Sequence, residues 1–179
     1  MIQDYATKTR LVIAGNQFQN EATKLLLHTL EFSGKEIDFI TPENSQINGN
    51  DFILFQAQNT ILNEYHPNIV LITDIQSSID YSPLLETVVD GGIVIFNEEN
   101  TELNHVVENA SNFFRKIPFN KPETEVSAGE IYVITDLGEI PLQIYSADNI
   151  SYIDGVKHLA QQLGIMESEF YESLLDFEF

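Results

Sequence analysis

Short apolar runs alternate with longer amphipathic or polar segments through the first two thirds of the chain. The runs are rich in Ile, Leu, Val and Phe, and they lie at 10–14, 36–40, 51–55, 68–73, 93–96 and 116–119. Near-continuous apolar runs of this length are typical of strands covered on both faces, as in a parallel sheet between two helical layers. The pattern predicts an α/β protein of three layers, α/β/α, with a mostly parallel sheet in the middle and a short edge strand at 116–119.

Apolar residues at helical spacing, with capping or helix-breaking residues at the ends of each segment, predict helices between these strands. The predicted helices follow Gly15 as far as Ser33-Gly34, cover 60–65, begin at Pro83 with Ser82 as N-cap, and cover 101–113 behind a cap in 97–100. Two further helices are predicted at 149–163 and 167–177. The segment 43–50 is polar and is predicted as a turn.

The character of the sequence changes after residue 120. Hairpin signals at 128–129 and 136–138 separate predicted strands at 125–126, 130–135 and 140–145. This predicts a small antiparallel β addition near residues 125–145. No repeat or linker interrupts the pattern, so we expect one domain over 1–179, with a polar lead-in at 1–9.

Composition and charge narrow the classes of function. The chain has 8 Lys and Arg against 28 Asp and Glu, a formal net charge of −20, and no basic residue lies between Lys35 and Arg115. The negative electrostatic field of this charge repels nucleic acid and anionic lipid, because binding to either needs Lys and Arg side chains that neutralise its phosphates. No apolar run approaches the roughly 18 residues that span a bilayer. We therefore expect a cytoplasmic protein without nucleic-acid or membrane partners, although an acidic excess also serves solubility alone.

The first strand runs through Gly15 into an amphipathic helix, a junction that resembles a phosphate-binding loop. A strand, a tight turn and a helix N-terminus together offer backbone N–H groups and a positive dipole end to an anion. A working loop also needs a second glycine, a lysine for the phosphates and a hydroxyl for the metal. Gly15 is instead followed by Asn16, Gln17, Phe18, Gln19 and Asn20.

Other candidate groups have weaker support. The four histidines lie far apart and share no metal-ligand spacing. Asp74 and Asp80, with Glu98 and Glu99, lie where strands are predicted to end and would suit a hard cation. Solvated loop carboxylates are the simpler explanation of these residues, and we predict no metal site.

Several short segments of the sequence resemble the central, ATP-binding domain of the Mur ligases. They are the segments 65–73, 91–100, 116–119, 138–144 and 163–165, in the family's order. The resemblance is strongest to the branch that attaches peptides to UDP-N-acetylmuramate, the UDP-N-acetylmuramate:L-alanyl-gamma-D-glutamyl-meso-diaminopimelate ligases. It implies a P-loop-type sheet and, in an intact ligase, activation of a carboxylate by ATP and Mg²⁺. The family's flanking UDP-sugar and amino-acid-binding domains are not represented in the chain.

The resemblance also implies which positions have changed. The family's Gly-Thr-x-Gly-Lys-Thr loop falls on 15–20, so that Phe18 stands for the second glycine, Gln19 for the lysine and Asn20 for the hydroxyl. Its acidic Glu-Gly-Asp-Glu motif falls on Gln56, Ala57, Gln58 and Asn59, which cannot hold Mg²⁺ by charge. Its Asp-His motif falls in 76–79, where no His remains. Its His-Asn-x-x-Asn motif falls on 148–152, beginning with Asp148 and Asn149.

Two functions follow as hypotheses. The first is a catalytically inactive Mur-ligase-like domain without a cofactor, acting by binding in peptidoglycan metabolism through a protein partner or self-association. The second is a residual ATP-dependent ligase or nucleotide-binding protein that works with domains from another chain; only this alternative expects ATP and Mg²⁺. In either case we expect the loop to keep its strand-to-helix turn, with Phe18 and Gln19 filling the space of phosphate and lysine.

Overall fold

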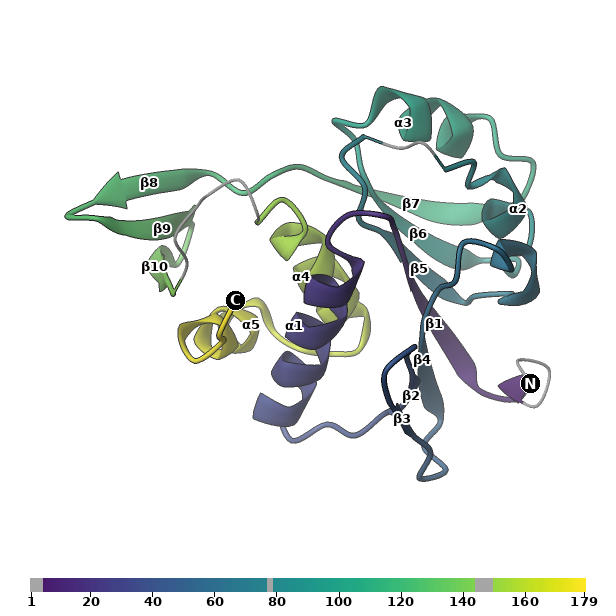
Figure 1. The fold of residues 1–179 in the computed structure, drawn as a ribbon, viewed down its shortest axis with the longest axis horizontal. Helices are drawn as coiled ribbons and strands as arrows, with labels where there is room; N and C mark the ends of the chain where they lie inside the picture. Colours follow the sequence, from purple (N-terminus) through teal and green to yellow (C-terminus); the bar gives the residue numbers. More distant parts are fainter. Residues whose placement is uncertain (1–4, 77–78, 144–149) are drawn as a thin grey trace.

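A seven-stranded, mostly parallel sheet forms the middle layer of the protein (Figure 1). The computed structural model describes residues 5–76, 79–143 and 150–179. The strands have the order β3-β2-β4-β1-β5-β6-β7, and only β3 runs antiparallel to its neighbour. Their bounds are β1 Thr9–Ala14, β2 Asp38–Ile40, β3 Ser45–Gln46, β4 Phe52–Gln56, β5 Ile69–Ile72, β6 Gly92–Asn97 and β7 Phe114–Phe119. The predicted sheet is confirmed, including β7 at its edge.

Helices cover both faces of this sheet, as the sequence pattern predicts. One face carries α1 (Gln19–Phe32), α4 (Ile153–Gln162) and α5 (Glu167–Leu175). The other face carries the 3₁₀ helix η2 (Leu62–Glu64), α2 (Ser82–Leu85) and α3 (Thr101–Glu108). Each layer has its own apolar core, because successive side chains of a strand point to opposite faces. In β1, for example, Leu11 and Ile13 pack with α1 while Val12 and Ala14 pack toward the other layer.

A second, three-stranded antiparallel sheet projects beside α5 (Figure 1). It consists of β8 (Thr124–Ser127), β9 (Glu130–Thr135) and β10 (Gly138–Leu142). Its residues Ile131, Val133 and Leu142 are buried, and the last two join the core around α1, α4 and α5. The antiparallel addition predicted near 125–145 is confirmed for the described residues, which stop at 143.

Three local predictions were wrong. The polar segment 43–50 contains the strand β3, whose two exposed residues pair with Phe39 and Ile40. The N-cap of α2 is Tyr81 rather than Ser82, because the Ser82 backbone N–H donates to the Asp80 carboxylate at 2.9 Å from inside the first turn. Helix α3 ends at Glu108, where the Asn109 side chain donates to the His105 carbonyl oxygen at 2.7 Å.

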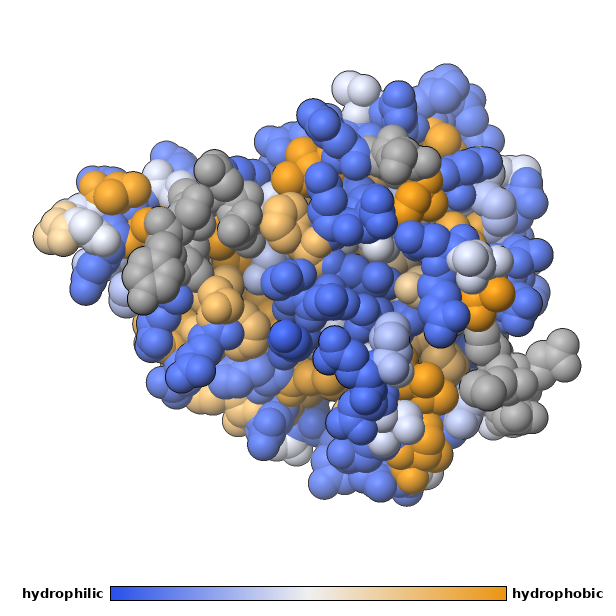
Figure 2. Space-filling model, viewed as in Figure 1, coloured by the Kyte–Doolittle hydropathy of each residue, from blue (hydrophilic) through white to orange (hydrophobic). Residues whose placement is uncertain are grey.

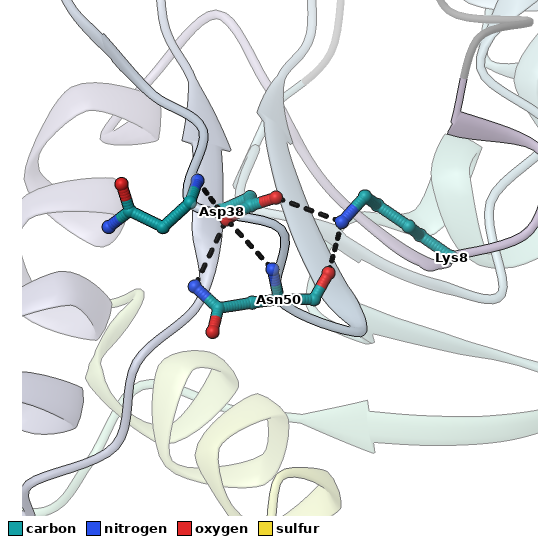
Figure 3. A network of polar contacts seen from close by, with 4 residues as sticks. Lys8, Asp38 and Asn50 are labelled. Atoms are coloured by element: carbon teal, nitrogen blue, oxygen red, sulfur yellow. Dashed lines mark hydrogen bonds and ion pairs between the residues drawn. The ribbon is translucent and has the colours of Figure 1, made fainter.

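A buried ion pair fixes the sheet end near β2 (Figure 3). The Asp38 carboxylate is fully buried and lies 2.9 Å from Lys8 Nζ. Its other oxygen accepts hydrogen bonds from Asn48 N at 2.9 Å and from Asn50 Nδ2 at 3.0 Å. The Lys8 ammonium also donates to the Asn50 carbonyl oxygen. One carboxylate therefore joins β2, the turn before β4 and the segment before β1.

Helix α4 packs closely on the sheet because Gly155 has no side chain. A Cβ at this position would lie 2.7 Å from Phe119 Cε1 and 2.8 Å from Leu71 Cδ1. Both are core side chains of the sheet, with exposures of 3% and 0%. The close approach of helix and sheet therefore depends on this glycine.

We expect Gly155→Ala to lower the free energy of unfolding by about 1–2 kcal/mol. Overpacking costs roughly 1–3 kcal/mol, and contacts of 2.7 and 2.8 Å with core side chains favour the upper half of that range, from which a gain of about 1 kcal/mol in helix propensity is subtracted. Urea denaturation followed by circular dichroism measures the change. Glu172→Ala, at an exposed position of α5, is the control and should change stability by less than about 0.5 kcal/mol. A Gly155→Ala variant as stable as the wild type would contradict the close packing.

Candidate functional site

The loop between β1 and α1 is the centre of the candidate site. It turns from strand to helix as predicted, and Phe18 forms the N-cap of α1 with a left-handed backbone (φ 61°). A Cβ on Gly15 would lie 2.2 Å from Thr73 Oγ1, so the loop contacts the end of β5 closely. The Thr73 hydroxyl donates to the Gln17 carbonyl oxygen. The turn is thus held against the carboxyl edge of the sheet.

The Asp74 carboxylate binds the backbone N–H groups of this loop. Asp74 Oδ1 accepts hydrogen bonds from Asn16 N at 2.6 Å and Gln17 N at 2.8 Å. Asp74 Oδ2 accepts from the Tyr81 hydroxyl at 2.6 Å, and the aspartate is fully buried. Backbone N–H groups at such a turn are the ones that bind phosphate in nucleotide sites. Here an anion of the chain itself is their partner.

Gln19 donates both hydrogens of its side-chain amide to the backbone. Its Nε2 lies 2.8 Å from the Ile13 carbonyl oxygen and 2.8 Å from the Ala57 carbonyl oxygen. These two acceptors belong to neighbouring parallel segments, at the ends of β1 and β4. The side chain therefore joins two strand ends and points away from the solvent above the loop.

Phe18 and Tyr152 stack on one another at the start of α1. Their ring centroids are 5.6 Å apart with an interplanar angle of 27°. Tyr152, which precedes α4, is 1% exposed. Its burial, with a smaller contribution from the nearby Glu21 carboxylate, raises the pKa of the Tyr152 hydroxyl above its ordinary value. The stack is a neutral, apolar contact in the place where the loop meets α4.

The remaining predicted site residues divide into three groups. Gln56, at the end of β4, donates to the Asn20 side chain across the loop. Gln58 and Asn59 are exposed in the segment after β4, and their side chains do not join this network. Asp148 and Asn149 lie outside the described residues. The structure therefore brings together the residues of the loop, Gln56 and Tyr152.

The carboxylates considered for a cation are held apart by other partners. Asp74 binds the loop and Tyr81, Asp80 accepts from Ser82 N, and Glu98 accepts from the Asn120 side chain. In the described part of the chain, no group of three or more His and acidic side chains is placed to hold a metal ion. No helix in that part is long and apolar enough to cross a membrane.

Comparison with solved structures identifies the fold. No protein-family model and no curated protein matches the sequence. Solved structures do match. MurF from Acinetobacter baumannii has a TM-score of 0.75 at 10% sequence identity, over 99% of this chain and 48% of the MurF chain. The chain has the Mur ligase fold.

Two further structures extend this comparison. The UDP-N-acetylmuramate:L-alanyl-gamma-D-glutamyl-meso-diaminopimelate ligase from Neisseria meningitides has a TM-score of 0.72 at 15% identity, over 97% of this chain and 67% of the ligase. FolC from E. coli, in complex with DHPP and ADP, has a TM-score of 0.65 at 9% identity over 98% of this chain. The chain spans about half the length of MurF, as expected if it corresponds to the central domain.

Within the Mur ligase fold, sequence reasoning missed the groups that complete the site. Thr73 and Tyr81 hold the loop and its carboxylate, and Tyr152 covers Phe18. The sequence suggests Asp74 only as a cation ligand. Its place at the carboxyl end of β5 was visible in the sequence, but its direction toward the loop was not.

Proposed function

We propose that this chain is a catalytically inactive Mur-ligase-like domain that acts by binding, as a partner or regulator in peptidoglycan metabolism in the cytoplasm. The observation that supports the proposal best is the Asp74 carboxylate on the loop N–H groups. A nucleotide phosphate at this loop would have to displace a buried internal anion. The nearby negative charge would also oppose a triphosphate.

The changed motifs support the same proposal because they contact one another. Phe18 and Tyr152 correspond to two different ligase motifs, and their rings stack. Gln19 and Ala57 also correspond to two motifs, and they share a hydrogen bond of 2.8 Å. Substitutions that compensate one another in this way stabilise a loop without ligand. A lysine in the place of Gln19 would supply the positive charge that phosphoryl transfer needs, and the glutamine does not.

Isothermal titration with ATP and MgCl₂ tests the proposal. We expect no binding tighter than a Kd of about 1 mM, which corresponds to roughly −4 kcal/mol. MurF from Thermotoga maritima, whose solved structure is a complex with ADP, serves as the positive control. A micromolar Kd for the present chain would overturn the proposal.

The alternative, a residual nucleotide-binding protein or ligase working with domains from another chain, has one observation in its favour. Asn97 Nδ2 and Ser151 Oγ are buried and have no hydrogen-bond partner among the residues that the structure describes. Asn97 ends β6 beside β5, and Ser151 precedes α4, so both lie near the carboxyl edge of the sheet. Buried polar groups without partners are uncommon and are often satisfied by a ligand or water. ADP release from a mixture of ATP, UDP-muramyl substrate and amine would support this alternative.

A further inference from the structure

A hollow of about 400 Å³ lies between α2 and α3, on the opposite face of the sheet from α1 and α4. Its apolar wall consists of Leu85, Val106 and Ala110, and its polar rim includes Glu86 and His105. The volume falls within the roughly 300–1,000 Å³ of typical binding pockets. We call it the α2–α3 groove. Figure 2 shows mainly hydrophilic side chains, with a few scattered hydrophobic ones, in the region of α3.

The groove is held open by hydrogen bonds of the backbone and of side chains. Asn112 Nδ2 donates to the Glu86 carbonyl oxygen at 2.7 Å and to the Val88 carbonyl oxygen at 3.1 Å. At the other end of α3, the Asn100 side chain accepts from Leu103 N at 3.0 Å. The Asn112 contacts hold the segment after α3 against the end of α2, and the Asn100 contact caps the start of α3. A partner would therefore meet a preformed surface, which lowers the entropic cost of binding.

An exposed aromatic residue follows the groove residues in the sequence. Phe113 is 79% exposed, more than any other large apolar side chain in the described residues. It follows directly on Ser111 and Asn112, of which Ser111 lines the groove. Aromatic residues, Phe among them, are enriched in protein interfaces relative to the rest of the surface.

The charge around the groove is negative. The stretch from Lys35 to Arg115, which supplies both helices, contains thirteen acidic residues and no basic residue between its ends. Glu86, Asp90, Glu102 and Glu108 are exposed on or beside α2 and α3. Lys116 pairs with Glu108 at 3.0 Å and so neutralises one of them. This rim attracts a positively charged partner and repels a negatively charged one.

We propose that the α2–α3 groove docks a basic amphipathic helix of a partner protein. The groove between two helices accepts the side-chain ridge of a third helix. The helix would place apolar side chains against Val106, Ala110 and Phe113, and Lys or Arg side chains against Glu86 and Glu102. This inference rests on the proposed binding function and names its surface.

A labelled model helix tests the inference. The probe is a fluorescein-labelled 18-residue Lys/Leu peptide with leucines at helical i, i+3, i+4 and i+7 spacing, followed by fluorescence anisotropy with the full chain. We expect micromolar binding at 50 mM NaCl, weakened about tenfold at 500 mM NaCl because screening removes the charge contribution. A scrambled peptide of the same composition should bind about tenfold more weakly.

Matched variants locate the binding on the surface. Phe113→Ala and Glu86→Lys, both at exposed positions, should each weaken binding about tenfold. Met166→Ala and Glu172→Lys change exposed residues of the α5 region and should leave it unchanged. The inference would be overturned if the scrambled peptide bound as tightly as the designed one or if the designed peptide did not bind. It would also be overturned if the two α5 control variants lost as much affinity as the two groove variants. None of these outcomes depends on the ATP titration, so failure here is distinguishable from failure of the inactive-domain proposal.

Discussion

Asp74→Ala is expected to lower the free energy of unfolding by about 2–4 kcal/mol. The substitution removes the acceptor of Asn16 N, Gln17 N and the Tyr81 hydroxyl, which lie 2.6–2.8 Å from the carboxylate. Each buried donor left without a partner costs roughly 1–3 kcal/mol, and water will satisfy part of the exposed loop. Urea denaturation at neutral pH measures the loss.

The same variant should gain an affinity for small anions. Once the carboxylate is gone, the loop N–H groups at the start of α1 are free to bind a phosphate-like ion. Thermal denaturation in sodium pyrophosphate, compared with NaCl at equal ionic strength, should therefore stabilise Asp74→Ala more than the wild type. The exposed Asp90→Ala serves as the control and should behave like the wild type.

Asp74→Asn separates the two effects and guards against loss of folding. It keeps an oxygen acceptor for the loop and removes the charge, so we expect a loss of only about 1–2 kcal/mol. If neither variant gained stability in pyrophosphate, the loop N–H groups would not form an anion site. The Asp74 carboxylate would then occupy no anion site and would not oppose nucleotide binding at the loop.

Asp38→Asn is expected to cost about 3 kcal/mol at pH 7. The carboxylate is fully buried, pairs with Lys8 and accepts bonds from Asn48 and Asn50. An asparagine has the same shape but turns one acceptor into a donor and leaves the ammonium of Lys8 without its counter-charge. Hydrogen bonds to charged groups contribute roughly 1.5–3 kcal/mol each. Chemical denaturation of Asp38→Asn and of the exposed neighbour variant Asp51→Asn measures the difference.

The cost of Asp38→Asn should depend on pH. Burial of the Asp38 carboxyl opposes ionisation, but the hydrogen bonds from Asn48 N, the Lys8 ammonium and Asn50 outweigh it and hold its pKa well below the ordinary value. The ionised form thus stabilises the fold fully above the unfolded-state pKa of about 3.9, and this contribution is lost as the pH falls toward the lower folded-state pKa.

We therefore expect the gap in stability between wild type and Asp38→Asn to narrow when measured at pH 3 instead of pH 7. The gap for Asp51→Asn should stay near zero at both values. A gap for Asp38→Asn that is constant from pH 7 to pH 3 would show that packing, and not the charge, accounts for the cost.

Sequence patterns predicted the layers and the parallel sheet because burial on two faces leaves a clear apolar run. They failed for β3, since its residues Ser45 and Gln46 are exposed and polar and become a strand only by pairing with β2. They also extended α3 too far, because the residues after Glu108 keep some helical spacing. The Asn109 side chain and the turn into β7 end the helix there.

The site was predictable as a set of changed residues but not as an arrangement. The sequence alone shows the substitutions at Phe18 and Gln19. The partners that give them meaning are distant in the sequence: Asp74 binds a loop 57 residues before it, and Tyr152 stacks on Phe18 from the start of another helix. Such contacts depend on how β1, β5 and α4 meet, which local patterns do not contain.

The Asp74 carboxylate has a consequence for how the loop is ordered. In a nucleotide-binding protein, part of the entropy lost by ordering such a loop is lost only when the ligand arrives, so the loop can change state with ligand concentration. Here the anion is tethered to the same chain and its local concentration never changes. Under the proposed function, the loop is ordered as part of folding, and the domain presents the same conformation at this edge whether or not ATP is present.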